Sequence, residues 1–155
     1  MASQLSTFAL WVGVIGSGIM AGVYFTFSGF VMRSLASIPR EAGIAAMQAI
    51  NVKILSSVFM PLFFATSALG LGLAIWGGLR GSPAALIGGL VYVVGMFVCT
   101  AAFNVPLNEA LDAVDPESAE AASLWTVYLR DWTRWNHVRT LACTVSTVLF
   151  LVALR

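Results

Sequence analysis

Three long stretches without a charged residue dominate this sequence: residues 1–32, 54–79 and 81–108. Each is longer than the roughly 20 residues that a helix needs to cross the hydrocarbon core of a bilayer. In the whole chain, 59% of the residues are hydrophobic and 10% are charged, whereas a soluble globular domain carries about 25% charged residues. Lipid is therefore the natural solvent of this chain, and the three stretches predict membrane-spanning helices.

A fourth apolar stretch, residues 140–154, is too short to cross a bilayer by itself. Its about 15 uncharged residues make roughly 22 Å of helix, against a hydrocarbon core of about 30 Å. To span, the helix must either bring Asn136, His137 and Arg139 to the membrane boundary or below it, or lie in locally thinned lipid. Polar groups at this depth are costly, so they usually face a protein interior or a wet cavity and mark a functional site.

Together the four stretches predict an all-α fold, a four-transmembrane-helix bundle that forms one integral-membrane domain over residues 1–155. The expected spans are about 5–32, 54–79, 83–108 and 136–154. No alternation typical of membrane β strands competes with this interpretation. The two cysteines lie inside apolar stretches and outside any CxxC arrangement, so we expect them to act as small hydrophobic residues in helix packing.

The two longer links carry signals of helix starts. Ser37 and Pro39 are typical of a cap and a first-turn proline, and residues 42–53 are rich in helix formers. The second helix is therefore expected to begin well outside the bilayer and to continue into its span. Asp115 and Pro116 predict the start of the fourth helix in the same way, so helices should extend beyond one membrane face.

Lysine and arginine gather in the same two links, since only Arg80 and Arg155 lie towards the other side. The positive-inside rule then places both longer links in the cytoplasm and both termini outside. The N-terminus lacks the basic region of a cleavable signal peptide, so the first stretch is expected to remain as a helix in contact with membrane lipids. The basic residues are scattered and the net charge is +1, which argues against nucleic acid as a partner.

Gly18 and Gly22 form a GxxxG motif in the first span. Small residues at this spacing let two helices approach closely. The motif indicates either packing inside the bundle or the seam of a homo-oligomer.

Asn104 and Asn108 are four residues apart near the end of the third span, so both amides project from one helix face. Pro106 lies between them, removes a backbone donor and is expected to kink the helix so that the amides turn towards a neighbour. The two alternatives are that these amides form hydrogen bonds between helices or that they bind a substrate. The proline alone is weak evidence, because Pro61 is expected to kink the second span without polar companions.

On the fourth helix, five residues recur at spacings of three and four and therefore form one face: Trp125, Trp132, Asn136, Arg139 and Cys143. Here Trp132 offers a flat wall and Asn136 a donor and an acceptor. Arg139 offers a fixed positive charge that can hold an anion or a developing oxyanion. The alternative is an ordinary membrane interface, with Trp125 and Trp135 in an aromatic belt and Arg139 reaching to the headgroups.

His137 is the only histidine. It lies about 100° from Asn136 and roughly 160° from Arg139 around the helix, so it need not share their cavity. It is a candidate general base or an interface residue. One histidine, with acids at no ligand spacing, predicts no metal site. Gln48 and Asn51, at the start of the second helix, either close the cavity or face water.

Four segments of this chain together resemble the anthrone oxygenase-like family of small four-helix membrane proteins. They are residues 18–28, residues 45–51, the motif Asn104-Val-Pro-Leu-Asn108 and the motif Trp132-Thr-Arg-Trp-Asn-His-Val-Arg139. The resemblance covers nearly the whole chain. It implies an oxygenase that oxidises a lipophilic aromatic small molecule, such as a polyketide anthrone, with molecular oxygen and with no cofactor.

Such an enzyme needs a flat pocket, a base and a cation that holds the enolate of its substrate. The resemblance assigns catalytic roles to His137, Arg139, Asn104 and Asn136, and substrate binding to Asn108, Trp132, Gln48 and Asn51. The alternative is a non-catalytic membrane protein, an assembly partner or a binder of a small molecule or lipid, whose polar residues are structural. No standard catalytic set is present, which favours this alternative.

Overall fold

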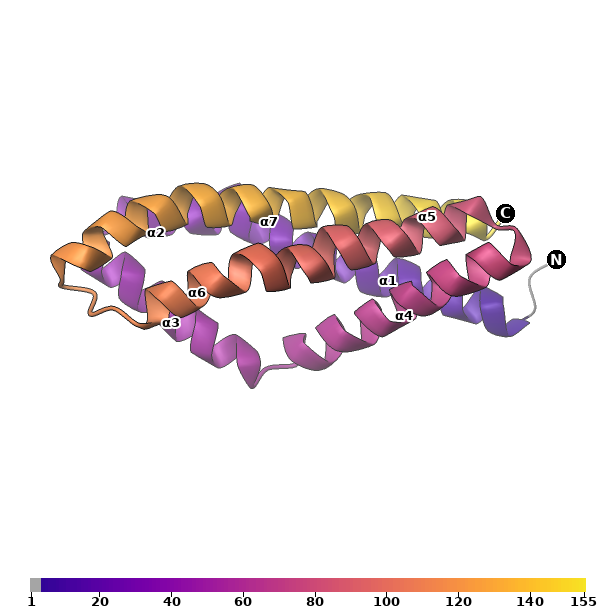
Figure 1. The fold of residues 1–155 in the computed structure, drawn as a ribbon, viewed down its shortest axis with the longest axis horizontal. Helices are drawn as coiled ribbons and strands as arrows, with labels where there is room; N and C mark the ends of the chain where they lie inside the picture. Colours follow the sequence, from indigo (N-terminus) through magenta and orange to yellow (C-terminus); the bar gives the residue numbers. More distant parts are fainter. Residues whose placement is uncertain (1–3) are drawn as a thin grey trace.

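A computed structural model describes residues 4–155, and this part of the chain folds into helices joined by short links (Figure 1). The all-α prediction is confirmed. The elements are α1 (Gln4–Thr26), the π-helical turn η1 (Phe27–Val31), α2 (Met32–Ser37), α3 (Arg40–Leu55), α4 (Phe59–Arg80), α5 (Pro83–Tyr92), the π-helical turns η2 (Val93–Val98) and η3 (Thr100–Asn104), α6 (Val105–Asp112) and α7 (Ala119–Ala153).

Four continuous helical stretches are long and apolar enough to cross a membrane: Gln4–Ser37, Phe59–Arg80, Pro83–Asp112 and Ala119–Ala153. Large apolar side chains on their outer surfaces are exposed, among them Phe8, Phe25, Leu79 and Leu141. Water would penalise such a surface, whereas lipid tails solvate it. The stretches therefore fit an integral membrane protein, as the sequence predicts.

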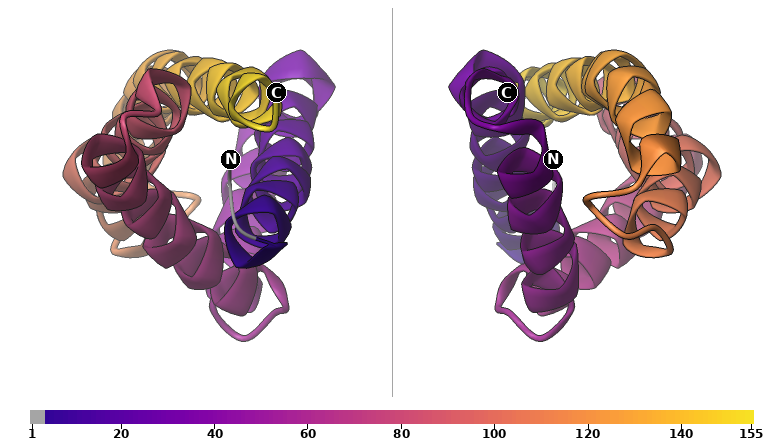
Figure 2. Two further views of the ribbon diagram at one scale, coloured as in Figure 1. Left: turned by 90° about the vertical axis from the view of Figure 1, so that its right-hand side faces the viewer. Right: turned by 90° about the vertical axis from the view of Figure 1, so that its left-hand side faces the viewer.

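The long helices lie side by side around a common axis (Figure 2). Helix α7 packs against α1 on one side and α5 on the other, and α4 packs against α5 and α1, which closes the ring. The start of α1, the turn between α4 and α5, and the C-terminus lie at one end of the bundle (Figure 1). The link from α2 to α3 and the link from α6 to α7 lie at the other end, which we call the α3 end.

Buried side chains fill the bundle in three layers. The layer at the α3 end contains Met47, Trp125 and Trp132, the middle layer contains Met20 and Cys143, and the last layer lies near the termini. The expectation that Trp125 joins an interfacial aromatic belt is wrong, because Trp125 is 5% exposed. Its place in the helical face directs it inwards, against α3.

The second span is not continuous with the helix before it. Helix α3 ends at Leu55, and α4 begins at Phe59 rather than at residue 54. In an unbroken helix, the ring of Pro61 would clash with the carbonyl of Ser57. In the structure this carbonyl accepts a hydrogen bond from the backbone N–H of Met60 (3.3 Å), and Pro61 lies in the first turn of α4, where proline is tolerated. Pro61 therefore marks a break rather than the predicted kink.

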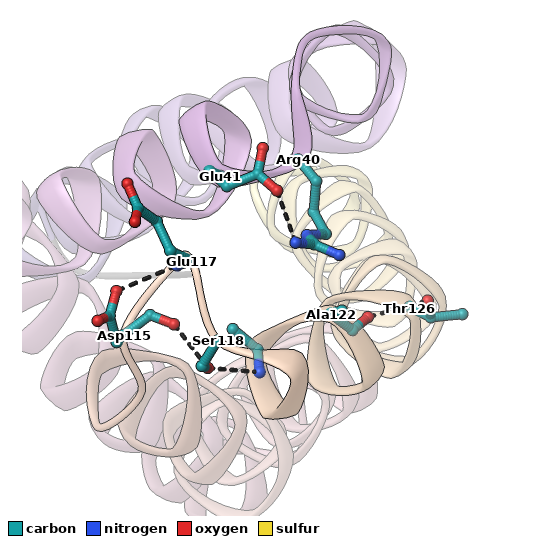
Figure 3. A network of polar contacts seen from close by, with 8 residues as sticks. Arg40, Glu41, Asp115, Glu117, Ser118, Ala122 and Thr126 are labelled. Atoms are coloured by element: carbon teal, nitrogen blue, oxygen red, sulfur yellow. Dashed lines mark hydrogen bonds and ion pairs between the residues drawn. The ribbon is translucent and has the colours of Figure 1, made fainter.

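Neither predicted cap begins a helix. The hydroxyl of Ser37 bonds back within α2, and α3 starts after Pro39. Asp115 Oδ1 instead accepts from the backbone N–H of Glu117 (3.1 Å), while Ser118 Oγ accepts from the N–H of Ala121 (3.0 Å) and caps α7 (Figure 3). Helix α7 then runs unbroken for 35 residues, roughly 52 Å. The fourth span therefore has ample helix, and what is short is only its apolar segment.

Glycines in α1 serve two different surfaces. A Cβ on Gly16 would lie 2.8 Å from Thr66 Oγ1, so this glycine permits the close contact between α1 and α4. A Cβ on Gly22 would meet no described atom within 4 Å. The GxxxG motif is thus not fully used inside the bundle, and its role in a homo-oligomer stays a prediction.

Candidate functional site

A cavity of about 270 Å³ lies between α1, α3, the first turns of α4, the third span and α7. Most of its wall is apolar and aromatic, and includes Phe27, Phe59, Phe63, Phe97 and Trp132. A few polar side chains also line it, namely Tyr24, Asn51, Thr100, Asn108 and Arg139. An apolar cavity with a few convergent polar groups is the usual form of a small-molecule site.

The break between α3 and α4 forms the rim of the cavity. Leu55, the last residue of α3, and Phe64, in the second turn of α4, both line the cavity and are 66% and 54% exposed. They therefore belong to the cavity wall and to the outer surface at once. A lipophilic molecule dissolved in the membrane would meet this rim first.

Arg139 is the charged group of the cavity and is only 5% exposed. Its Nη2 donates to Asn136 Oδ1 (2.7 Å), and its Nη1 makes a long hydrogen bond to Thr100 Oγ1 (3.4 Å). Its Cζ lies over two rings, 4.4 Å from the centroid of Tyr24 and 5.1 Å from that of Trp132. Both contacts are cation–π interactions. The alternative that Arg139 extends to the headgroups is therefore wrong.

No carboxylate in the described chain pairs with Arg139. The ion pairs found in residues 4–155 join neighbours in sequence, Arg40 with Glu41 (Figure 3) and Arg130 with Asp131. The Nε of Arg139 is buried without a hydrogen-bond partner there. A buried cation costs free energy unless an opposite charge or a set of acceptors compensates it. Arg139 therefore has both the charge and a spare donor for a negatively charged oxygen.

Asn136 positions Arg139 and does not line the cavity. It is fully buried, and its Nδ2 donates to the backbone carbonyl of Tyr24 (2.6 Å) and to Ser28 Oγ. These two bonds leave Oδ1 facing the guanidinium of Arg139. Ser28 lies in the π-helical turn η1, a kind of insertion that is frequent at functional sites. Asn136 therefore contacts Arg139 and not the cavity.

Asn104 is likewise a structural link. Its Nδ2 donates to the backbone carbonyl of Trp132 (3.2 Å), it is fully buried, and it does not line the cavity. It lies at the end of the π-helical turn η3, two residues before Pro106. The irregularity predicted at this proline is thus a π-helical turn directly before it, in which the backbone N–H of Val105 donates to the carbonyl of Thr100.

Asn108 and Asn51 are the amides that reach the cavity. Asn108 Oδ1 accepts from Tyr128 Oη and from Trp132 Nε1, both at 2.8 Å. Since the oxygen holds two donors, the Nδ2 of Asn108 is left to donate elsewhere. Asn51 Nδ2 donates to Asp112 Oδ1 (3.1 Å). Both asparagines of the third span thus face α7, as their spacing predicts, but only Asn108 can touch a ligand.

Two residues assigned to the site from the sequence do not belong to it. Gln48 Nε2 donates to the carbonyls of Leu111 (2.8 Å) and Val114 (2.9 Å), so it ties α3 to the end of α6. His137 is exposed on the outer side of α7 and does not line the cavity. The rotation of about 100° per residue from Asn136 explains its direction. The cavity therefore gives no support to a catalytic role of His137 or a binding role of Gln48, and both roles stay predictions.

Sequence reasoning missed the other half of the site. Tyr24 and Thr100 line the cavity beside Arg139, and each is a polar residue inside a long apolar stretch, which is the signal that could have found them. The aromatic residues of α4 carried no such signal. Among residues 4–155, no three His, Cys, Asp or Glu side chains come together as metal ligands.

The fold and the site define a class of protein, a small four-span helical bundle with an apolar cavity that contains an unpaired arginine. A sequence model described as anthrone oxygenase matches residues 51–149, most of the chain, and includes Asn51, Asn108, Trp132 and Arg139. The chain belongs to the anthrone oxygenase family. Comparisons with curated proteins and with solved structures find no match.

Proposed function

We propose that this protein is a membrane-embedded oxygenase that oxidises a lipophilic aromatic compound with molecular oxygen and needs no bound cofactor. The observation that carries the proposal is the buried, carboxylate-free Arg139 in an aromatic cavity that opens at the outer surface. Membership of the anthrone oxygenase family agrees with this chemistry.

An anthrone-type substrate can supply the electrons for the reaction itself. Loss of a proton from the carbon opposite its carbonyl gives an enolate, which donates electrons to O₂ and forms a carbon–oxygen bond. Protonation gives a hydroperoxide at this carbon. The remaining C–H bond of the same carbon and the O–O bond then break, water leaves, and the carbon becomes a second carbonyl. One substrate and one O₂ thus give one quinone and one water.

Each cavity group has a role in this proposal. Arg139 holds the enolate oxygen and stabilises its charge in a medium of low dielectric constant. The rings of Trp132 and Phe63 flank the flat substrate, and both line the cavity. The free Nδ2 of Asn108 is placed to donate to a second oxygen of the substrate.

Oxygen consumption with emodin anthrone tests the proposal. Purified protein in detergent or nanodiscs should accelerate oxygen uptake above the spontaneous rate and form the quinone. The Arg139→Gln variant should lose at least about a hundredfold of this acceleration, since a single oxyanion donor is typically worth that much. Arg134→Gln changes an exposed arginine of the same helix and should retain it. No acceleration by the folded wild type with several anthrones would refute the proposal.

The alternative is a non-catalytic binder or assembly partner. Its support is that Asn104 and Asn136 bond to backbone carbonyls of other helices, as structural residues do. This alternative predicts that a flat aromatic ligand binds without oxygen uptake, and that Asn104→Ala lowers thermal stability. Oxygen uptake that depends on Arg139 would exclude it.

We also propose the sidedness and association that the sequence indicates. The α3 end, with most of the Lys and Arg residues, would face the cytoplasm, and lipids would cover the apolar outer surface. The exposed Gly22 leaves the first helix open to a second copy. Labelling of single cysteines at Ser37 and Ser82 from either side tests the sidedness, and cross-linking at Gly22→Cys tests the association.

A further inference from the structure

We propose that the cavity binds a weakly acidic phenol or enol as its oxyanion on Arg139, with the proton released to water rather than to a side-chain base. This inference rests on the site of the proposed function and deepens it. The sequence placed a catalytic base at His137. In this inference no side-chain base is required, because the charge of Arg139 in the cavity favours ionisation of the ligand.

The side chains that line the cavity offer no ordinary base. Among the described lining residues, Tyr24 and Arg139 are the titratable ones, and none is Asp, Glu, His or Lys. Tyr24 Oη donates to Met96 Sδ (3.3 Å), and its ring lies against the guanidinium of Arg139. A tyrosine held as a donor beneath a cation does not accept a proton near neutral pH.

The other titratable side chains around Arg139 are tyrosines and cysteines. Tyr24 faces it from α1, Cys99 from the third span, and Tyr128 and Cys143 from α7 itself. Cys99 Sγ donates to the carbonyl of Trp135 (3.8 Å). Tyr128 Oη is bonded to Asn108. None of these side chains is a carboxylate, and no ion pair in residues 4–155 involves Arg139. An anionic ligand would supply the missing partner.

The physical reason for ionisation is that the unpaired cation favours the charged form of a bound acid. Apolar surroundings alone would raise the pKa of a bound phenol, whereas an opposite charge within about 4–6 Å lowers this pKa. In this cavity the cation is already buried and already desolvated. The ligand oxyanion therefore receives the attraction of Arg139 without a further cost for burying that cation.

Ionisation of the bound ligand moves one proton and no electrons. Either the O–H bond of a phenol breaks or the C–H bond of a carbon acid such as an anthrone. Both electrons of that bond stay on the ligand, and the proton passes to water on the polar side of the cavity, where Asn51 lines it. On the same side, the exposed Asp112 accepts from the cavity-lining Asn51. No oxidant or reductant is needed, so ionisation is separable from oxygenation.

The probe for the test is 2-hydroxyanthraquinone, a flat three-ring phenol that changes colour on ionisation. Both of its central carbons are already carbonyls, so the proposed enzyme cannot oxygenate them. The absorbance of the bound probe is followed from pH 4 to pH 10 in protein-containing nanodiscs and in empty ones. We expect the midpoint in the presence of wild-type protein to be at least about one pH unit lower, a tenfold change in the ionisation constant.

Matched variants separate charge from fold. Arg139→Gln should remove the downward shift, Arg139→Lys should retain part of it, and the exposed Arg134→Gln should retain all of it. Unsubstituted anthraquinone, which has no proton to lose, should still bind to Arg139→Gln if the cavity is intact. Should that variant fail to fold, proton release from the wild type in weakly buffered solution gives the same answer, with about one proton per bound probe at a pH where the free probe is neutral.

A bound probe that stays neutral, or a shift that persists in folded Arg139→Gln, would overturn the inference. The two proposals fail differently. Ionisation of the probe without oxygen uptake from emodin anthrone would refute the oxygenase and leave the anion site. Oxygen uptake with a neutral bound probe would refute the anion site and leave the oxygenase.

Discussion

The link from Asn136 to Arg139 can be tested by a double-mutant cycle. Asn136→Leu removes two bonds from Nδ2, to the Tyr24 carbonyl and Ser28 Oγ, and one charge-assisted bond from Arg139 Nη2. Hydrogen bonds between membrane helices average about 0.6 kcal/mol, and bonds to charged groups are worth about 1.5–3 kcal/mol. The variant should therefore lose about 3–4 kcal/mol of stability.

The double variant Asn136→Leu/Arg139→Met should lose much less than the sum of the two single losses. Once the cation is absent, no buried charge requires the Asn136 oxygen, so a coupling free energy of about 1.5–3 kcal/mol is expected. Unfolding in mixed detergent, followed by circular dichroism, measures all four proteins. Thr144→Val, at an exposed hydroxyl of the same helix, should change stability by less than about 0.5 kcal/mol. Additive losses would show that Asn136 does not support the charge of Arg139.

Three further predictions concern residues around the site. His137→Ala should keep oxygen uptake within about twofold of the wild type at every pH, because His137 is exposed outside the cavity. If activity falls and the pH–rate profile loses its acid limb, His137 acts as a base after all. Gln48→Ala should lower the free energy of unfolding by about 1–2 kcal/mol, since two partly buried hydrogen bonds to the end of α6 are lost, and it should leave KM unchanged. A raised KM with an unchanged melting temperature would return Gln48 to the binding site. Gly16→Val should destabilise the bundle by about 1–3 kcal/mol, because the added side chain would clash with Thr66. Gly22→Ala should leave the melting temperature of the monomer unchanged. Equal effects at both positions would contradict the packing described for α1.

The sequence was sufficient for the architecture because the bilayer imposes strict limits. Stretches of more than about 20 apolar residues have one stable form in lipid, the helix. The inward face of α7 could also be read, since Trp132, Asn136, Arg139 and Cys143 recur at helical spacing and are all buried. The same spacing argument allowed His137 to lie outside the cavity, and the structure places it there.

Local signals were less reliable where tertiary contacts compete with them. Ser37 and Asp115 are good caps by type, yet Ser118 begins α7 and Pro39 precedes α3. Cap preferences amount to about 1 kcal/mol, which the docking of α3 against α6 and α7 outweighs. The sequence predicted that Pro61 disturbs the second span. That the helix breaks completely instead of kinking depends on how α3 and α4 pack.

What the sequence determined by itself is therefore the four-span helical bundle and the polar face of its last helix, because helix length and helical period follow from local chemistry. Only the tertiary structure decided which polar groups touch a ligand. Asn104 and Asn136 are fully buried in links between helices, while Asn51, Asn108 and Tyr24, from three other segments, line the cavity with Arg139. The short apolar segment of the fourth span thus indicated the part of α7 that contributes Trp132 and Arg139 to the cavity. The composition of the site depended on contacts between residues far apart in the sequence, such as the hydrogen bond from Asn136 to Tyr24, 112 residues away, and no local pattern encodes these contacts.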